Sequence, residues 1–346
     1  MGSFRPLAPG PRPPISPRSL TVAALLAITL LPLHAPLHAA TRPRYGGTLR
    51  VQVRQAETPD PPPFLTSGFT MTRWDAGRSA VYEADDNAPG GRPFLDSVEI
   101  TLGRPLREQS IDLELGKADV VELGPDEMRR SPAGRKVWTS SPVRVLALVF
   151  SNRFDDAAAR EALALVVDRS AIHTVLFARQ GEVSAALLPQ WLSGDAFLFP
   201  AAADVPRARS LSKGARPISI GVEDPALRRV AERIVLDGRA AGLNVTVAAQ
   251  PANADLRLTE LRITSPEPSR ALASMAGALG LPDPVRGDSP EALYAAERTL
   301  LDGFRIIPLL HLPDIYGAGP RVRGGSGIGT LGEWRFENLW LEGPRP

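Results

Sequence analysis

The stretch 217–247 restricts the possible folds more than any other part of the chain. It begins with the strand pattern Ile218–Val222 and ends with the strand pattern Leu243–Val247. Between them, Asp224 and Pro225 supply an N-cap and a proline at the first helical position, and Gly242 stands where a helix ends. Two strands joined by a helix through short connections pair in parallel. The sequence therefore predicts an α/β fold.

Further elements follow from hydrophobic periodicity. Alternating or continuous apolar runs predict strands at Leu49–Val53, Ser79–Glu83, Val98–Leu102, Ala118–Leu123, Val143–Phe150 and Ile306–Leu310. Apolar residues at helical spacing predict helices over Leu106–Leu115, from Asp155 or Asp156 onward, and over Glu291–Leu301. We expect strands and helices to mix within one α/β architecture.

The first 40 residues have the order of a secretory signal peptide. Arg5, Arg12 and Arg18 precede the apolar run Leu20–Leu33, and small residues follow up to Ala40. The run is shorter than the roughly 20 residues that cross a bilayer. We expect cleavage after residue 39 or 40 and export to the periplasm; the alternative is an uncleaved membrane anchor.

Charge and cysteine content exclude several classes of protein. The chain has 40 basic and 38 acidic residues, and without the three arginines of the leader 37 basic residues remain. A body with balanced charge offers no basic field for nucleic acid, so we expect no nucleic-acid partner. The sequence has no cysteine, which excludes disulfides, thiolate chemistry and a lipid anchor on cysteine.

Residues for catalysis or metal binding are scarce. Beyond the leader only His173 and His311 occur, and neither has a histidine or cysteine at metal-ligand spacing. No G-x-S-x-G motif is present. The glycine-rich stretch Gly324–Gly329 lacks the lysine and the following helix of a phosphate loop, so it predicts a flexible loop. We predict no catalytic residue, no metal site and no cofactor.

Several segments together resemble one protein family. They occur in that family's order and are Tyr45–Leu49 (YGGTL), Trp74–Ile100, Gly116–Leu123 (GKADVVEL), Phe154–Arg169 (FDDAAAREALALVVDR), Gly242–Val247 (GLNVTV), Ile307–Leu309 and Trp334–Leu341. The family is the extracellular solute-binding proteins of family 5, the peptide and nickel type of ABC importer binding protein.

The resemblance implies a two-lobed, periplasmic-binding-protein-like architecture with mixed sheets that closes on a ligand like a hinge. We expect residues 41–150 plus 318–346 to form the first lobe and residues 151–317 the second. The implied function is to bind a peptide or similar small solute, without catalysis, and to deliver it to ABC permease subunits in the inner membrane. We expect a monomer.

The chain also departs from that family. The proline-rich stretch Thr58–Pro63 runs almost directly into Thr66–Phe69, which resembles a much later passage of the family. We therefore expect the first lobe to be truncated.

Four residues are candidate ligand contacts on the two sides of the groove that the resemblance implies. They are Gln55 and Glu57, just past the first strand, and Arg262 and Glu267. A second hypothesis is a degenerate scaffold that acts as a periplasmic interaction module without transport. A third is an exported hydrolase, which labelling by a serine-directed probe would reveal.

Overall fold

The computed structural model describes residues 42–54, 64–65, 67–130, 134–194, 198–343. The predicted signal peptide, residues 1–40, and the predicted contacts Gln55 and Glu57 lie outside these residues. Among the described residues, no helix combines the length and the apolar character needed to cross a membrane.

The strands fall into one large mixed sheet and one small pair. In chain order they are β1 (Thr48–Gln52), β2 (Phe69–Asp75), β3 (Ser79–Ala84), β4 (Ser97–Thr101), β5 (Val120–Glu122), β6 (Lys136–Phe150), β7 (Glu182–Val183), β8 (Ile218–Val222), β9 (Val245–Val247), β10 (Leu256–Arg262), β11 (Ile306–Ala318), β12 (Val322–Arg323) and β13 (Trp340–Leu341). The large sheet has the order β2-β3-β4-β1-β5-β11-β6-β10-β8-β9, with β7 added beside β11, and β12 pairs with β13.

Helices connect the strands. They are α2 (Leu106–Glu114), α3 (Pro125–Arg130), α4 (Ala157–Val166), α5 (Arg169–Ala171), α6 (Gln190–Ser193), α7 (Val205–Leu211), α8 (Arg228–Ala240), α9 (Pro268–Ala278) and α10 (Pro290–Leu301), with the short turns η1 (Ile172–Leu176), η2 (Pro225–Leu227), η3 (Pro251–Asn253) and η4 (Asp302–Phe304). Of the two candidate caps at residues 155 and 156, Asp156 starts α4, because its side chain accepts a hydrogen bond from the Ala159 amide at 2.9 Å.

The part of the sheet nearest the N-terminus is mixed. Strand β1 is parallel to β4 and β5, whereas β3 is antiparallel to both β2 and β4. Its buried side chains, such as Leu49 and Val98, pack with Phe336 and Leu339 from the C-terminal segment. The two ends of the described chain thus share one hydrophobic core.

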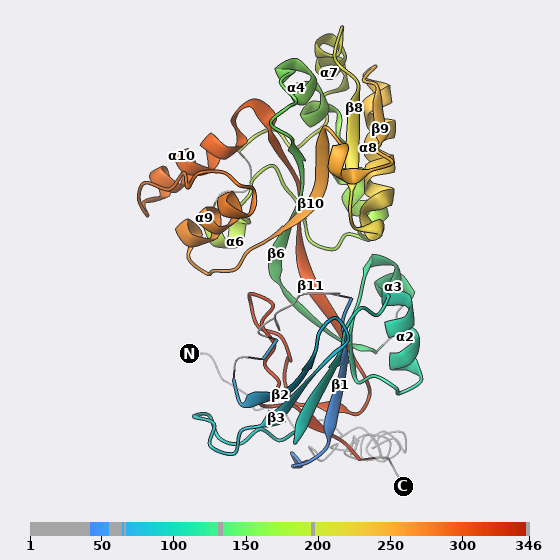
Figure 1. Ribbon diagram of the computed structural model, residues 1–346, viewed down its shortest axis with the longest axis vertical. Helices are drawn as coiled ribbons and strands as arrows, with labels where there is room; N and C mark the ends of the chain where they lie inside the picture. The colour runs from blue at the N-terminus through green and yellow to red at the C-terminus, as the bar shows by residue number, and fades with distance from the viewer. Residues whose placement is uncertain (1–41, 55–63, 66, 131–133, 195–197, 344–346) are drawn as a thin grey trace, which may run out of the picture. The chain divides into compact units, whose positions relative to one another are not determined.

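Strands β6 and β11 are the longest in the structure and pair with each other in antiparallel register (Figure 1). In the second half of β6, the side chains alternate between two hydrophobic clusters. Leu146 and Leu148 pack with α4 and α8, while Val145 and Ala147 pack with α9 and α10. Helices therefore cover both faces of this half of the sheet, as a strand buried on both faces requires.

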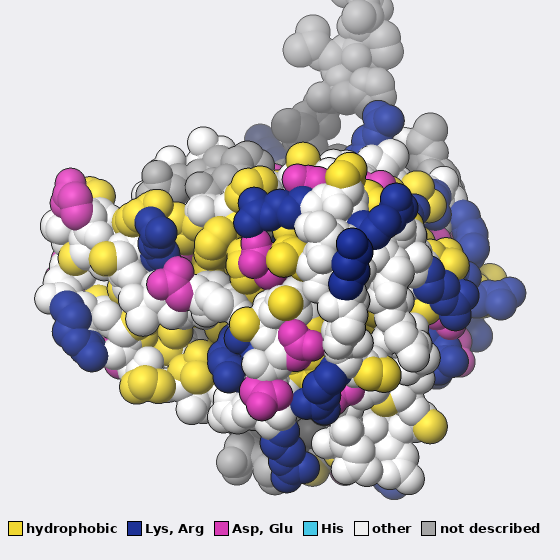
Figure 2. Space-filling model, turned by 90° about the horizontal axis from the view of Figure 1, so that it is seen from above, with side chains coloured by type: hydrophobic (Ala, Val, Ile, Leu, Met, Phe, Trp, Pro, Cys, Tyr) yellow, Lys and Arg dark blue, Asp and Glu magenta, His cyan; other side chains and the backbone are white. Residues whose placement is uncertain are grey.

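Most of the predicted elements are confirmed. The stretch 217–247 forms β8, η2, α8 and β9, with β8 and β9 parallel, and Gly242 follows the helix at a φ of 80°. Strands β6 and β11 are longer than predicted, and β2, β10 and α9 were not predicted. The surface carries mixed charge: Figure 2 shows a face on which basic, acidic and hydrophobic side chains are interspersed.

Candidate functional site

Charged side chains gather where β6, β10 and β11 lie side by side. Four of them form what we call the crossing cluster: Arg144 of β6, Glu260 and Arg262 of β10, and Asp314 of β11. Their ion pairs all involve one of the two arginines. The cluster holds two positive and two negative groups.

A β-bulge turns Asp314 toward the cluster. Pro142 of β6 stands opposite Pro313 of β11, and the register shifts on both sides of Pro313. Proline has no amide hydrogen to donate to the ladder, so two prolines face to face interrupt it. The extra residue of a bulge leaves its strand's regular alternation. The Asp314 amide donates instead to the Ser140 hydroxyl at 2.9 Å, which fixes the bulged backbone.

Asp314 neutralises two arginines that face each other across the sheet. Arg144 and Arg262 are directly opposite in the β6–β10 register. Like charges in that position repel. Asp314 separates them: its Oδ1 lies 3.1 Å from Arg144 Nε, and its Oδ2 accepts a hydrogen bond from Arg262 Nη2 at 2.6 Å. The Asp314 carboxylate therefore offsets the repulsion between the two arginines.

Glu260 adds a second negative charge beside Arg144. Its Oε2 accepts from Arg144 Nη1 at 2.8 Å. Burial acts to lower the pKa of Arg144, but the charges of Glu260 and Asp314 outweigh it and raise that pKa above its ordinary value. Arg144 is therefore a permanent cation of the cluster.

The C-terminal segment approaches the same ion pair. Arg262 Nη2 also lies 3.3 Å from the carbonyl oxygen of Leu331. A Cβ atom on Gly332 would lie 2.3 Å from Asp314 Oδ2 and 2.6 Å from Arg262 Nη2. With its φ of 82° and this lack of space, position 332 requires glycine. The segment therefore closes one side of the cluster.

Glu122 lies beside the cluster at the end of β5. Its carboxylate accepts a hydrogen bond from the Arg54 amide, and the Gln109 side chain accepts from its own amide at 2.9 Å. Burial raises the pKa of Glu122, with the nearby arginine charges acting in the opposite direction. The guanidinium of Arg54 extends to Asp224, the cap of η2, at 2.6 Å. A chain of polar contacts thus leads from β5 to the start of α8.

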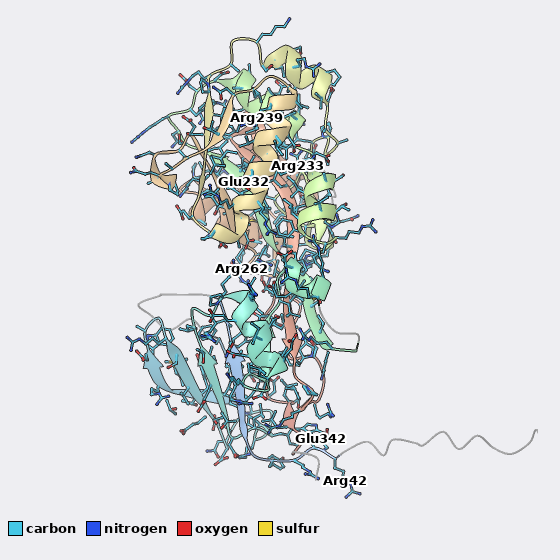
Figure 3. All side chains as sticks on the ribbon, turned by 90° about the vertical axis from the view of Figure 1, so that its right-hand side faces the viewer. Arg42, Glu232, Arg233, Arg239, Arg262 and Glu342 are labelled. Atoms are coloured by element: carbon cyan, nitrogen blue, oxygen red, sulfur yellow. The ribbon has the colours of Figure 1, made fainter. Side chains whose placement is uncertain are left out.

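The predicted contacts fall in different places. Arg262, labelled in Figure 3, belongs to the crossing cluster. Its side chain is 47% exposed. Glu267 stands at the N-cap position of α9 without a side-chain capping hydrogen bond, pairs with Arg270 at 2.9 Å and borders a shallow surface pocket. No hydrogen bond or ion pair joins Arg262 to Glu267 in the described part of the chain. The structure therefore does not bring these two candidates together.

Sequence reasoning missed Arg144, Glu260 and Asp314. A signal was present, because Arg144 interrupts the apolar run Val143–Phe150 and Asp314 interrupts the apolar pattern of β11. Charged residues are rarely buried unless they are paired. Two such interruptions of opposite charge in neighbouring strands predict an ion pair.

Both histidines of the described residues, His173 and His311, have structural contacts. His311 is 2% exposed, and its Nε2 lies 2.9 Å from the Ala186 carbonyl and 3.2 Å from the Ser184 hydroxyl. Ser184 is fully buried, so a substrate does not reach this serine–histidine contact. Within the described ranges, no three His, Cys, Asp or Glu side chains are placed to hold a metal ion.

The cluster can hold a charged solute without reacting with it. Arg262 offers a half-exposed guanidinium, whose planar fork suits a carboxylate. Beside it, the stretch 259–262 of β10 pairs with β6 on one side and has no ladder partner on the other among the described residues. Such a strand edge can pair with an extended main chain.

Solved structures with the same fold come from bacterial solute-binding proteins. The ABC transporter substrate-binding protein CtaP of Listeria monocytogenes matches with a TM-score of 0.65 and 13% identity, over 79% of this chain and 66% of that one. The oligopeptide-binding protein AppA of Bacillus subtilis, in complex with a nonapeptide, matches with a TM-score of 0.63 and 13% identity, over 80% and 66%.

NikA of Staphylococcus aureus, in complex with Ni(L-His)2, matches with a TM-score of 0.66 and 13% identity, over 80% of this chain and 68% of that one. The chain thus spans about two thirds of the length of these structures. They establish a periplasmic-binding-protein fold. No curated protein matches the chain in sequence.

The family model of bacterial extracellular solute-binding proteins, family 5, matches residues 12–283. This range covers most of the chain and includes β1 to α9, which confirms the family resemblance; the segments Ile307–Leu309 and Trp334–Leu341 lie beyond it. The chain therefore belongs to family 5 of the bacterial extracellular solute-binding proteins, a family of non-catalytic binding proteins.

Proposed function

We propose that this chain is the solute-binding component of an ABC importer and that it holds a peptide or a similar small solute at the crossing cluster. The observation that carries the proposal is the half-exposed Arg262 at the end of the open edge of β10. Main-chain hydrogen bonds along that edge would hold an extended peptide, and Arg262 would bind its terminal carboxylate.

The proposal includes the expected lobes and location. Residues 41–150 plus 318–346 form the first lobe and residues 151–317 the second, with β6 and β11 passing between them. Residues 1–40 direct export to the periplasm, where the monomeric protein delivers its solute to permease subunits in the inner membrane. Two of the fold relatives carry ligands of this kind, a nonapeptide in one and a nickel–histidine complex in the other.

Calorimetry with short peptides tests the proposal. We expect tripeptides with free termini to bind and to raise the melting temperature, because a ligand of the native state stabilises it. Amidation of the peptide's C-terminus removes the carboxylate and should weaken binding at least about tenfold, since a hydrogen bond to a charged group contributes roughly 1.5–3 kcal/mol.

Two variants locate the binding site. Arg262→Gln should weaken binding of the free tripeptide to the level of its amide. Arg257→Gln is the matched control, because Arg257 is an exposed arginine of the same strand, nearer the other end of β10. Equal affinity of both variants for the free peptide would contradict the assignment of Arg262.

One observation favours the second candidate function, a degenerate scaffold that acts as a periplasmic interaction module. The stretch Thr58–Pro63 runs almost directly into Thr66–Phe69, which resembles a much later passage of the family, so the first lobe is shortened within the chain. If no peptide and no nickel–histidine complex changes the melting temperature, the module without transport becomes the better explanation.

A further inference from the structure

A second, smaller cavity lies away from the crossing cluster. Its volume is about 180 Å³, and it is bordered by α4, α5, η4 and the first residues of β11. Asp314 of the cluster lies six positions along β11 from Pro308 at the cavity wall, which corresponds to about 20 Å. The cavity and the crossing cluster are therefore separate in space.

The walls of this cavity are mainly apolar. Leu165 of α4, Ile307 of β11 and the rings of Phe199 and Phe304 border it, and the two ring centroids lie 5.4 Å apart. An apolar cavity of about 150 Å³ is large enough for benzene. The space suits the hydrocarbon part of a small molecule.

Arg169 brings a positive charge to this apolar space. It is 3% exposed, donates from Nε to the Pro308 carbonyl at 2.9 Å and from Nη1 to the Ala164 carbonyl at 3.1 Å. Its Nη2 has no hydrogen-bond partner, and no carboxylate pairs with it, among the residues that the structure describes. Burial lowers the pKa of Arg169 to about 10, so it remains charged at neutral pH.

The other charged groups of the cavity do not neutralise Arg169. Glu161 and Arg207 also border the space, but they pair with each other at 2.5 Å. The charged side chains that line the cavity therefore sum to one positive charge. A buried charge without an opposite partner is costly, and an anion that enters the cavity would remove that cost.

We propose that this cavity is a second binding site, for a small monocarboxylate with an apolar body. The carboxylate would accept hydrogen bonds from the free side of the Arg169 guanidinium, and the hydrocarbon would lie against Leu165, Phe199 and Phe304. The site is built within 161–308, so its occupation does not depend on peptide binding at the crossing cluster.

Benzoate is the probe, measured by calorimetry against benzamide and benzylamine on the full mature chain. The three share size and ring, and only benzoate is an anion. We expect benzoate to bind with a Kd of about 1 mM or lower and at least about tenfold more tightly than the other two. Absence of benzoate binding, or equal binding of benzamide, would overturn the proposal.

Two matched arginine variants separate binding from stability. Arg160 is also buried and donates to two carbonyl groups, of Gly303 at 2.7 Å and Phe154 at 3.1 Å, but it does not border the cavity. Both Arg169→Lys and Arg160→Lys should lower the melting temperature. Only Arg169→Lys should weaken the binding of benzoate, by at least about tenfold. Equal loss of benzoate affinity in both variants would count against the site.

A third variant tests the cavity itself without altering either arginine. Ala164→Leu adds carbon atoms at the cavity wall and should abolish benzoate binding in a folded protein. Arg262→Gln should leave benzoate affinity unchanged while it weakens peptide binding. If Arg262→Gln instead lowers the affinity for benzoate, the probe binds at the crossing cluster and the second site is refuted.

Discussion

At the scale of single residues, burial decides the charge state of His311. The ring is buried against β7 and the segment after it, and this loss of hydration lowers its pKa from the ordinary 6.5 to about 4. The histidine is therefore neutral in the native protein at physiological pH. Its Nε2 contact with the Ala186 carbonyl suits the neutral tautomer that carries its proton on Nε2.

This depressed pKa predicts a loss of stability in acid. Between pH 6.5 and 4 the unfolded chain binds a proton at position 311 that the native state does not, so the free energy of unfolding falls as the pH falls. From pH 7 to 4.5 this contribution is about 2 kcal/mol. Urea unfolding of His311→Gln, which keeps a donor for Ala186, should show a correspondingly flatter pH dependence.

His173→Gln is the control for that measurement. His173 contacts the Gly181 carbonyl at 3.0 Å and is partly exposed. Its variant also removes one imidazole, so comparison of the two variants isolates the effect of the buried ring. Parallel profiles for the original protein and His311→Gln would show that burial of His311 does not set the acid stability.

The crossing cluster shows which residues the sequence can and cannot assign. Arg262 was a candidate, but its partners Arg144 and Asp314 were not, because pairing depends on the strand register and on the bulge at Pro313. Neither the strand register nor the bulge can be predicted from a local pattern of residues. Glu267 was chosen from the same stretch of sequence, yet it lies at the start of α9 with a partner in its own helix.

At the scale of elements, the prediction succeeded where the pattern is local. The β8–α8–β9 unit has its cap, apolar stripe and terminal glycine within one stretch. Strand β2 was missed because only Phe69 of its residues is buried, so its sequence has no apolar alternation. Strands β6 and β11 were predicted too short because polar residues and prolines interrupt them at the bulges.

Two helical glycines predict opposite effects of the same substitution. Gly238 of α8 faces β9, and a Cβ there would lie 2.6 Å from Val245 Cγ2, whereas Gly277 of α9 has no atom within 4 Å of that position. Gly277→Ala should stabilise the protein by up to about 1 kcal/mol, because alanine favours the helix. Gly238→Ala should destabilise it by about 1–3 kcal/mol through overpacking.

Denaturant unfolding of both variants measures this difference. The glycines lie in the last turns of two separate helices, so a general effect of the substitution would appear in both. Stabilisation of Gly238→Ala would mean that α8 can move away from β9 at little cost.

At the scale of the whole molecule, ion pairs connect the two proposed lobes. Arg54, just after β1, pairs with Asp224 at 2.6 Å, and Asp126 of α3 pairs with Arg229 of α8 at 3.2 Å. A guanidinium nitrogen of Arg129 also donates to the Val175 carbonyl. Exposed pairs of this kind contribute about 0–1 kcal/mol each, which is enough to shift a balance between open and closed forms severalfold.

These contacts predict that the protein opens, in the absence of solute, when salt is added or when the paired charges are removed. Arg54→Gln combined with Arg229→Gln removes both ion pairs, and 0.5 M NaCl screens them. Small-angle X-ray scattering should then give a larger radius of gyration than for the original protein in low salt. Arg228→Gln is the matched control, since Arg228 pairs with Glu232 inside α8 at 3.1 Å and should leave the radius unchanged. If the double variant in low salt scatters like the original protein, these ion pairs do not hold the lobes together, and the hydrophobic contacts along β6 and β11 alone set their separation.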